Sequence, residues 1–143
     1  MTRYLLDTNI ISQAVKPEPS AELLRWMQDQ ADEDLFISAF TLADIQRGIL
    51  DKPNGAKRRA LETWFSGPEG PLALFAGRIL PLDDVAALWW AELMAAGRAA
   101  GRPRSPLDMI IAATAVANDC IIVTDNLRDF HGLPRLNPLR PAG

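Results

Sequence analysis

Acidic residues stand at four places where an apolar segment of this sequence stops or begins. Asp7 follows residues 4–6, Asp44 follows residues 35–38, Asp108 precedes the apolar segment 109–117, and Asp125 and Asp129 follow residues 121–123. In an open α/β sheet, residues at the carboxyl ends of parallel strands meet at one edge. Carboxylates gathered there repel one another unless a cation lies between them. The pattern therefore predicts an acidic metal site with Asp7 as its anchor.

The available ligand types favour a hard divalent cation. Oxygen ligands alone suit Mg²⁺ or Mn²⁺. The chain has one histidine, His131, and one cysteine, Cys120, so neither a zinc site of Cys and His ligands nor a cysteine–histidine catalytic pair can be assembled. Cys120 lies in an apolar run and is predicted to be a small core residue. No glycine-rich loop follows the first apolar run, which disfavours P-loop and dinucleotide-binding sites.

The length and composition indicate a single globular domain over residues 1–143. A chain of 143 residues can bury a core but is too short for two ordinary domains. Its 48% hydrophobic and 23% charged residues argue against disorder and against a fibrous fold. The apolar segment 109–117 is too short to cross a bilayer, and no secretory signal precedes the first apolar run. We therefore expect a cytoplasmic protein without membrane association.

Basic residues are few but clustered. The net charge of −3 argues against a generally basic surface. One cluster contains Lys57 and Arg58, and another contains Arg102 and Arg104 just before Asp108. Either cluster can be a solvated surface. A basic rim beside an acidic metal site would suit a phosphodiester substrate, so these four residues are candidates for binding such a substrate.

Strands and helices are expected to alternate along the chain. Apolar runs predict strands at residues 4–6, 35–38, 79–82 and 121–123, with a possible edge strand at 135–138. Helices are expected at residues 10–15, after the cap Ser20, from Thr41, over 56–65, from Asp83 or Asp84, and after the cap Ser105 through residue 117. Residues 97–106 are expected to form a loop. This alternation predicts an α/β fold with a parallel sheet and helices on both faces.

Several of the acids also have a purely structural interpretation. Asp44 and Asp108 each occupy the third position of a predicted helix, where a carboxylate bonds back to the capping residue. Asp125 and Asp129, taken alone, are typical surface turn residues. Asp7 ends a buried strand and must be solvated or partnered. The metal-site prediction therefore depends on the whole set.

The helix predicted after Asp83 or Asp84 carries an unusually wide apolar band. Trp89 and Trp90 belong to it, and one small core is not expected to cover all of it. An uncovered apolar band is typical of an interface between subunits. We therefore expect a homodimer.

Four segments together resemble one known family. They read LLDTN at 5–9, ISAFTLAD at 37–44 followed by Arg47-Gly48, DMIIAATA at 108–115, and VTDNLRDF at 123–130. In these segments the chain is similar to PIN-domain ribonucleases, in particular the VapC and FitB-like toxins of bacterial toxin–antitoxin pairs, and residues 74–81 and 136–138 extend the likeness. The resemblance implies a three-layer α/β/α sandwich around a parallel sheet. It also implies Mg²⁺- or Mn²⁺-dependent endoribonuclease activity by metal-activated water, and a small antitoxin partner.

The resemblance also implies roles for individual residues. Asp7 and Asp108 would hold the metal, and Asp44 and Asp129 would complete the catalytic set. Possible supporting residues are Asn9, Thr124, Asp125 and Asn126. The family usually has Glu where this chain has Asp44, and some members have an acid where it has Asn126. Asp129 is therefore expected to be the fourth acid, with Asp125 as the alternative, and the antitoxin is expected to insert a basic side chain into this site.

Two other functions remain open from the sequence. A PIN-like RNA-binding module could have lost full metal affinity through Asp44 and Asn126. A phosphatase-like or receiver-like acidic pocket on a similar sheet would require a lysine near the site, and no lysine lies in the motifs. Metal-dependent RNA cleavage by the pure protein would separate an enzyme from a binding module.

Overall fold

A five-stranded parallel sheet forms the centre of the molecule. The structure, a computed structural model, describes residues 2–139. The strands are β1 (Arg3–Leu6), β2 (Leu35–Ser38), β3 (Ile79–Leu80), β4 (Cys120–Val123) and β5 (Arg135–Leu136). Their order is β3-β2-β1-β4-β5, and every neighbouring pair is parallel. The predicted parallel α/β architecture is confirmed, with β1 at the centre of the sheet.

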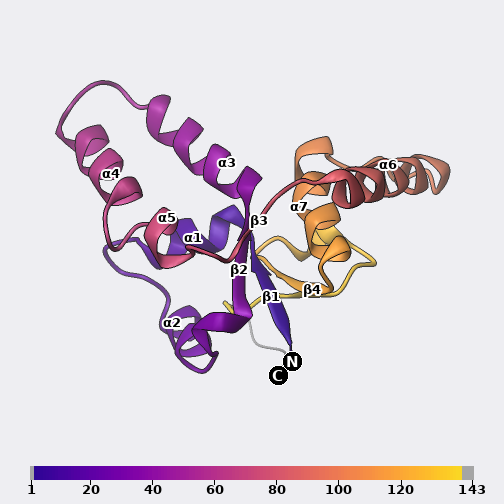
Figure 1. Ribbon diagram of the computed structural model, residues 1–143, viewed down its shortest axis with the longest axis horizontal. Coiled ribbons are helices and arrows are strands. Elements are labelled where there is room, and N and C mark those ends of the chain that lie inside the picture. The colour runs from indigo at the N-terminus through magenta and orange to yellow at the C-terminus, as the bar shows by residue number, and fades with distance from the viewer. Residues whose placement is uncertain (1, 140–143) are drawn as a thin grey trace.

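Helices cover both faces of this sheet (Figure 1). They are α1 (Thr8–Ala14), α2 (Ala21–Gln28), α3 (Ala39–Leu50), α4 (Ala56–Ser66), α5 (Pro71–Leu74), α6 (Asp84–Ala99) and α7 (Pro106–Ala117), with short 3₁₀ turns at Asp32–Asp34 and Leu127–Phe130. Figure 1 places α6 and α7 on one side of the strands and α1 to α5 on the other. The result is the expected three-layer α/β/α sandwich.

Two apolar cores result from the alternation of side chains along the strands. Leu5 of β1 packs with Met109 of α7 and Phe130, whereas its neighbour Leu6 packs with Ile10 and Leu23 on the opposite face. Successive side chains of a strand point to opposite faces, so one short apolar strand contributes to both cores. This burial on both sides explains why β1 is apolar at consecutive positions.

Several expected boundaries were wrong. Helix α3 begins at Ala39 and not at Thr41, because Ser38 is the N-cap and its Oγ accepts a hydrogen bond of 3.0 Å from the Thr41 amide. Helix α6 continues through Gly97 to Ala99, where a loop was expected. Strand β3 stops at Leu80, because the following Pro81 has no amide hydrogen to donate to a neighbouring strand.

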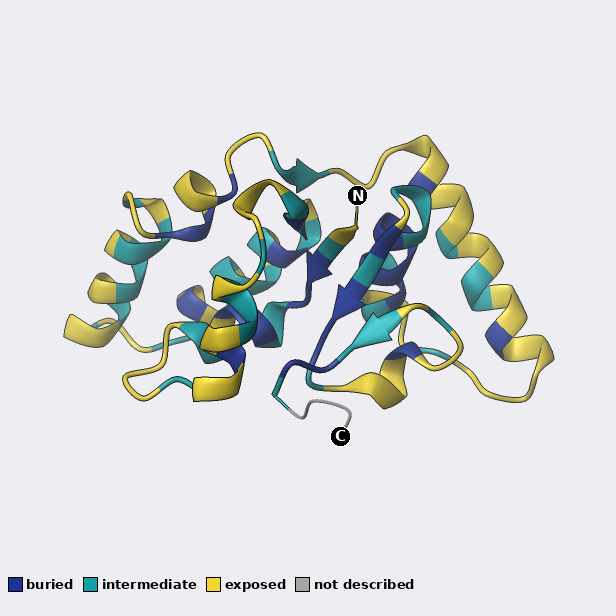
Figure 2. Cartoon of the chain, turned by 90° about the horizontal axis from the view of Figure 1, so that it is seen from below, coloured by how far each residue is buried: buried dark blue, intermediate teal, exposed yellow. Residues whose placement is uncertain are grey.

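The apolar band of α6 divides between the core and the surface. Trp90 packs against the core, and its indole nitrogen donates to the Pro106 carbonyl at 2.9 Å. On the other side of the helix Leu88, Val85 and Trp89 are 70%, 51% and 43% exposed. Figure 2 shows α6 exposed along most of its length. Among residues 2–139, no helix is both long and apolar enough to cross a membrane.

Candidate active site

The four predicted acids surround a single pocket of about 380 Å³ beside the end of β1. Asp7, Asp44, Asp108 and Asp129 all line it. Asp7 directly follows β1, Asp44 lies on α3, Asp108 on α7, and Asp129 in the 3₁₀ turn after β4. Their convergence follows from the parallel topology, which brings these segments to the same edge of the sheet.

Asp7 is held in place by hydrogen bonds from the start of α1 and from Thr124, which directly follows β4. It caps α1, and its carboxylate accepts from the Thr8 amide at 2.8 Å, the Thr124 hydroxyl at 2.9 Å and the Asn9 amide nitrogen at 3.2 Å. Burial raises the pKa of this carboxyl, the bonds from Thr124 and Thr8 oppose that shift, and the nearby charges of Asp125 and Asp44 add to it. Asp7 is thus a fixed, buried carboxylate in an electronegative site.

Asp108 occupies the first turn of α7, as predicted. Ser105 is the N-cap, Pro106 is the first helical residue, and the Asp108 amide donates to Ser105 Oγ at 3.2 Å. Burial, the charge of Asp129 with a hydrogen bond between the two carboxyl groups, and the charge of Asp7 together raise the pKa of Asp108 to about 6. Asp108 and Asp129 therefore form a carboxyl pair that resists double ionisation.

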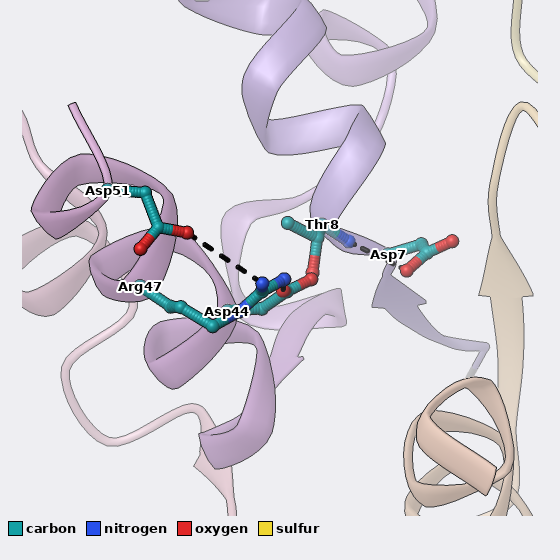
Figure 3. A network of polar contacts seen from close by, with 5 residues as sticks. All are labelled: Asp7, Thr8, Asp44, Arg47 and Asp51. Carbon is teal, nitrogen blue, oxygen red and sulfur yellow. Dashed lines mark hydrogen bonds and ion pairs between the residues drawn. The ribbon is translucent and has the colours of Figure 1, made fainter.

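Asp44 lies further along its helix than predicted. It lies in the second turn of α3, so it does not cap the helix, and the capping interpretation was wrong. Its carboxylate is 2.9 Å from the Arg47 guanidinium, which also lies 3.9 Å from Asp51 (Figure 3). Arg47 is therefore a local counter-ion that competes with any cation for the Asp44 carboxylate.

Hydrogen bonds link the candidate supporting residues to the acids. The side chains of Asn9 and Thr124 both donate to Asp7, and the backbone amide of Asn126 donates to Thr124 Oγ1 at 3.0 Å. The Asn126 side chain also donates to the Asp129 carboxylate at 2.5 Å. Asn126 thus orients Asp129.

Asp125 and Asp129 differ in where they lie. Asp129 lines the pocket with Asn126, whereas Asp125 is absent from the pocket lining. The Asp125 amide donates to Asn9 Oδ1 at 3.3 Å, so its backbone supports the site from behind. The geometry favours Asp129 as the fourth acid of the pocket.

Sequence reasoning missed four residues of the pocket lining: Thr8, Ser12, Gln13 and Lys16. Lys16, an exposed residue after α1, lines the pocket although it lies outside every motif. No lysine lies in the motifs, but the pocket nevertheless has one. Thr8 was not proposed as a site residue, yet it lines the pocket, and its hydroxyl is buried with no hydrogen-bond partner among the described residues. Lys16 has no local sequence signal, because its place follows from the path of α1, whereas Thr8 lies inside the LLDTN segment.

The four basic candidates separate into two pairs. Lys57 and Arg58 lie on α4 and do not line the acidic pocket, and Arg58 is 2.7 Å from Glu62. Arg102 and Arg104 line a second, larger pocket of about 720 Å³, here called the arginine groove. Its walls come from α6, the loop before α7, and the turn after β4: Leu93, Ala96, Gly97, Ala100, Arg102, Pro103, Arg104, Ser105, Asp108, Arg128, Asp129 and His131. Asp108 and Asp129 line both pockets, so the two are contiguous.

The acidic pocket offers suitable ligands for one hard divalent cation. Within residues 2–139, no three His, Cys, Asp or Glu side chains already form a metal-binding group. Magnesium is commonly held by one or two carboxylates together with water, so a set of three protein ligands is not required. Burial and then the charges of Asp129 and Asp7 raise the pKa of Asp108, and Thr8 has an unsatisfied hydroxyl. A hydrated cation would offset the carboxylate repulsion and could accept the Thr8 hydroxyl as a partner.

Comparison with known proteins gives a consistent assignment. The PIN domain profile matches residues 4–136. The VapC ribonuclease Y4jK of Sinorhizobium fredii is 37% identical over 140 residues, covering 96% of this chain and 99% of that protein. Toxin FitB of Neisseria gonorrhoeae is 33% identical, covering 88% and 89%. The crystal structure of FitAcB from the same organism superposes with a TM-score of 0.85 at 33% identity, covering 94% of this chain and 97% of that one. The chain belongs to the PIN domain family.

Proposed function

We propose that this protein is a Mg²⁺- or Mn²⁺-dependent endoribonuclease and the toxin of a bacterial toxin–antitoxin pair. The observation that carries the proposal is the convergence of Asp7, Asp44, Asp108 and Asp129 on one pocket of a PIN domain. Relatives named as a VapC ribonuclease and as a toxin support both the reaction and the biological role. The protein acts in the cytoplasm, where RNA is available.

In this proposal the acids divide into two groups. Asp7 and Asp108 would hold the cation, Asp7 from a position fixed by its three hydrogen bonds and Asp108 from the start of α7. A bound divalent cation would lower the pKa of water and offset charge on the phosphodiester. Asp129, oriented by Asn126, accepts a proton from the attacking water, and Asp44 adds negative charge that strengthens cation binding. Lys16 lies where it can attract the phosphate group.

The pocket also suggests how the enzyme is restrained. A cluster of carboxylates is a receptor for an arginine, whose planar guanidinium pairs with carboxylate oxygens and displaces a cation. We propose that a small antitoxin inserts such a basic side chain among the acids. The exposed apolar side of α6, which includes Leu88, supports a homodimer as the working form.

The test is cleavage of single-stranded RNA by the purified protein with Mg²⁺ or Mn²⁺, and with EDTA. We expect cleavage with either metal and none with EDTA. Asp108→Asn should lower the rate at least about a hundredfold, because the amide can keep the helix start but brings no charge. Glu33→Gln, at an exposed acid remote from the pocket, should behave like the parent.

The outcomes separate the candidate functions. An Asp108→Asn protein that cleaves at the parent rate would remove the assignment of the site. RNA binding without metal-dependent cleavage would instead identify a binding module. Because Lys16 lines the pocket, a phosphatase-like activity is also tested directly, and hydrolysis of a phosphomonoester in place of RNA would overturn the ribonuclease proposal.

A further inference from the structure

We propose that the arginine groove binds the nucleotide next to the scissile phosphate, with its base stacked on His131 and its backbone paired with Arg102 and Arg128. This inference rests on the proposed function and adds a subsite to it. The groove is contiguous with the acidic pocket, because Asp108 and Asp129 line both. A strand whose phosphodiester lies among the acids must place a neighbouring nucleotide on one side of them. The groove is a ready-made path for that nucleotide.

The size and lining of the groove suit a nucleotide. Its volume of about 720 Å³ lies within the range of small-ligand sites. Leu93 and Ala96 of α6, with its C-cap residue Ala100, form part of an apolar wall. His131 lines the groove and is exposed, so its ring is accessible to a base. Unpaired RNA bases are commonly stacked on aromatic rings, including histidine, and on guanidinium planes.

The arginines of the groove have separate tasks. The guanidinium of Arg104 donates to the His131 carbonyl at 2.5 Å, which ties the loop before α7 to the segment that carries the ring. Arg102 and Arg128 are exposed and form no ion pair within residues 2–139. They are therefore free to pair with phosphate groups. This local excess of positive charge is notable in a protein whose net charge is −3.

The loop that carries Arg102 packs closely against helix α6. Gly97 is buried inside the helix, and its carbonyl accepts from the Arg102 amide at 2.9 Å. A Cβ at position 97 would lie 2.9 Å from both the Arg102 carbonyl oxygen and Arg104 Cγ. The loop therefore rests directly on the helix backbone, which fixes the backbone from which Arg102 and Arg104 project.

The charge of the groove favours RNA over a basic peptide. The side chain that an antitoxin would insert among the acids is positive, and Arg102, Arg104 and Arg128 would repel further positive charge beside it. A phosphate backbone is attracted by the same residues and gains from counterion release on binding. The groove and the acidic pocket thus suit different ligands.

Binding to an RNA that the protein cleaves tests the groove. An Asp7→Asn background prevents cleavage and leaves every groove residue intact, and fluorescence anisotropy gives the affinity at several salt concentrations. We expect His131→Ala to weaken binding about five- to tenfold, and His131→Phe to restore most of it. The double variant Arg102→Gln, Arg128→Gln should reduce the slope of log affinity against log salt by about 1.4, or roughly 0.7 per phosphate contact.

Two controls make the test specific. Arg98→Gln removes an exposed arginine of α6 that does not line the groove, and it should have little effect. An RNA with an abasic position beside the cleavage site should bind the Asp7→Asn protein about five- to tenfold more weakly, and removing His131 as well should add little further loss.

The outcomes distinguish a failure of the nucleotide subsite from a failure of the proposed ribonuclease function. If the parent protein cleaves RNA and the groove variants bind like Arg98→Gln, the subsite is wrong and the ribonuclease stands. If the parent neither binds nor cleaves RNA, both proposals fail. If the groove variants lose no RNA affinity but no longer bind an arginine-containing antitoxin peptide, the groove is a protein-docking surface, which also overturns the inference.

Discussion

At the residue scale, Asp108 and Asp129 illustrate the cost of bringing carboxylates together before a cation is bound. The pKa of Asp108 is raised to about 6, first by burial and then by Asp129. The folded state therefore holds this proton more tightly than the unfolded chain does, in which the carboxyl titrates near 3.8. The stability that this bound proton contributes to the folded state is fully present below about pH 4 and is lost as the pH rises through about 6.

This linkage predicts that Asp108→Asn stabilises the metal-free protein at about pH 8. We expect a gain of roughly 1 kcal/mol in the free energy of unfolding, a value reduced for the solvent that screens a partly exposed group. The gain should disappear near pH 4, where the parent carboxyl is protonated. Urea unfolding in EDTA at several pH values provides the measurement. A stability difference that does not change with pH would contradict the interpretation.

The turn after β4 gives a second prediction at this scale. Asp129 lines the pocket and Asp125 does not, so Asp129→Ala should reduce RNA cleavage more than Asp125→Ala. Assays over a range of Mn²⁺ concentrations would show whether the loss lies in metal affinity or in the rate at saturating metal. Asn126→Ala is a useful companion, because it leaves both acids and removes only the hydrogen bond that orients Asp129. A larger loss of cleavage from Asp125→Ala would show that Asp125, and not Asp129, is the fourth acid of the site.

At the element scale, two helical glycines provide a matched pair. Gly97 of α6 is packed against the loop before α7, whereas a Cβ at Gly48 of α3 would meet no atom within 4 Å. Gly48→Ala should stabilise the protein by about 0.5–1 kcal/mol through helix propensity. Gly97→Ala should instead destabilise it by about 1–3 kcal/mol, since the loop must move. Thermal unfolding of both variants checks this, and equal stabilisation would show that the loop yields easily.

The same scale shows how far the sequence determined the fold and the site. The apolar runs of β1, β2 and β4 and the Ser105-Pro106 start of α7 were predicted correctly, because strand hydrophobicity and capping are local signals. The start of α3 was misjudged because Ser38 and Thr41 are both residue types that cap helices, and it is Ser38 Oγ that accepts from the Thr41 amide.

Features that depend on distant segments could not be predicted in this way. Lys16 reaches the acidic pocket only because α1 begins at its edge. The arginine groove combines residues from α6, the loop before α7, and the turn after β4, so no single window of sequence contains it. Periodicity specifies which face of an element is buried, but not which two surfaces meet.

At the scale of the whole molecule, the outer side of α6 predicts self-association. Leu88 and Val85 are 70% and 51% exposed on one helix, an arrangement that favours contact with a second copy. Light scattering should therefore report a dimer, and Leu88→Asp should shift it towards the monomer. Leu50→Asp, at a site 51% exposed on α3, is the control that should leave the dimer intact. A strictly monomeric parent would remove the dimer proposal.

The two outer strands restrict how copies of this chain can join. Both β3 and β5 contain two residues, with Pro81 just after the first, and Pro134 and Pro138 around the second. Prolines lack the amide hydrogen that an added strand would need, and such short strands offer few free backbone groups. The sheet is therefore a poor template for strand addition, the backbone pairing that leads to aggregates. When this protein is abundant, helical surfaces remain the route to assembly, so the copies can associate without risking the spread of β-structure from one molecule to the next.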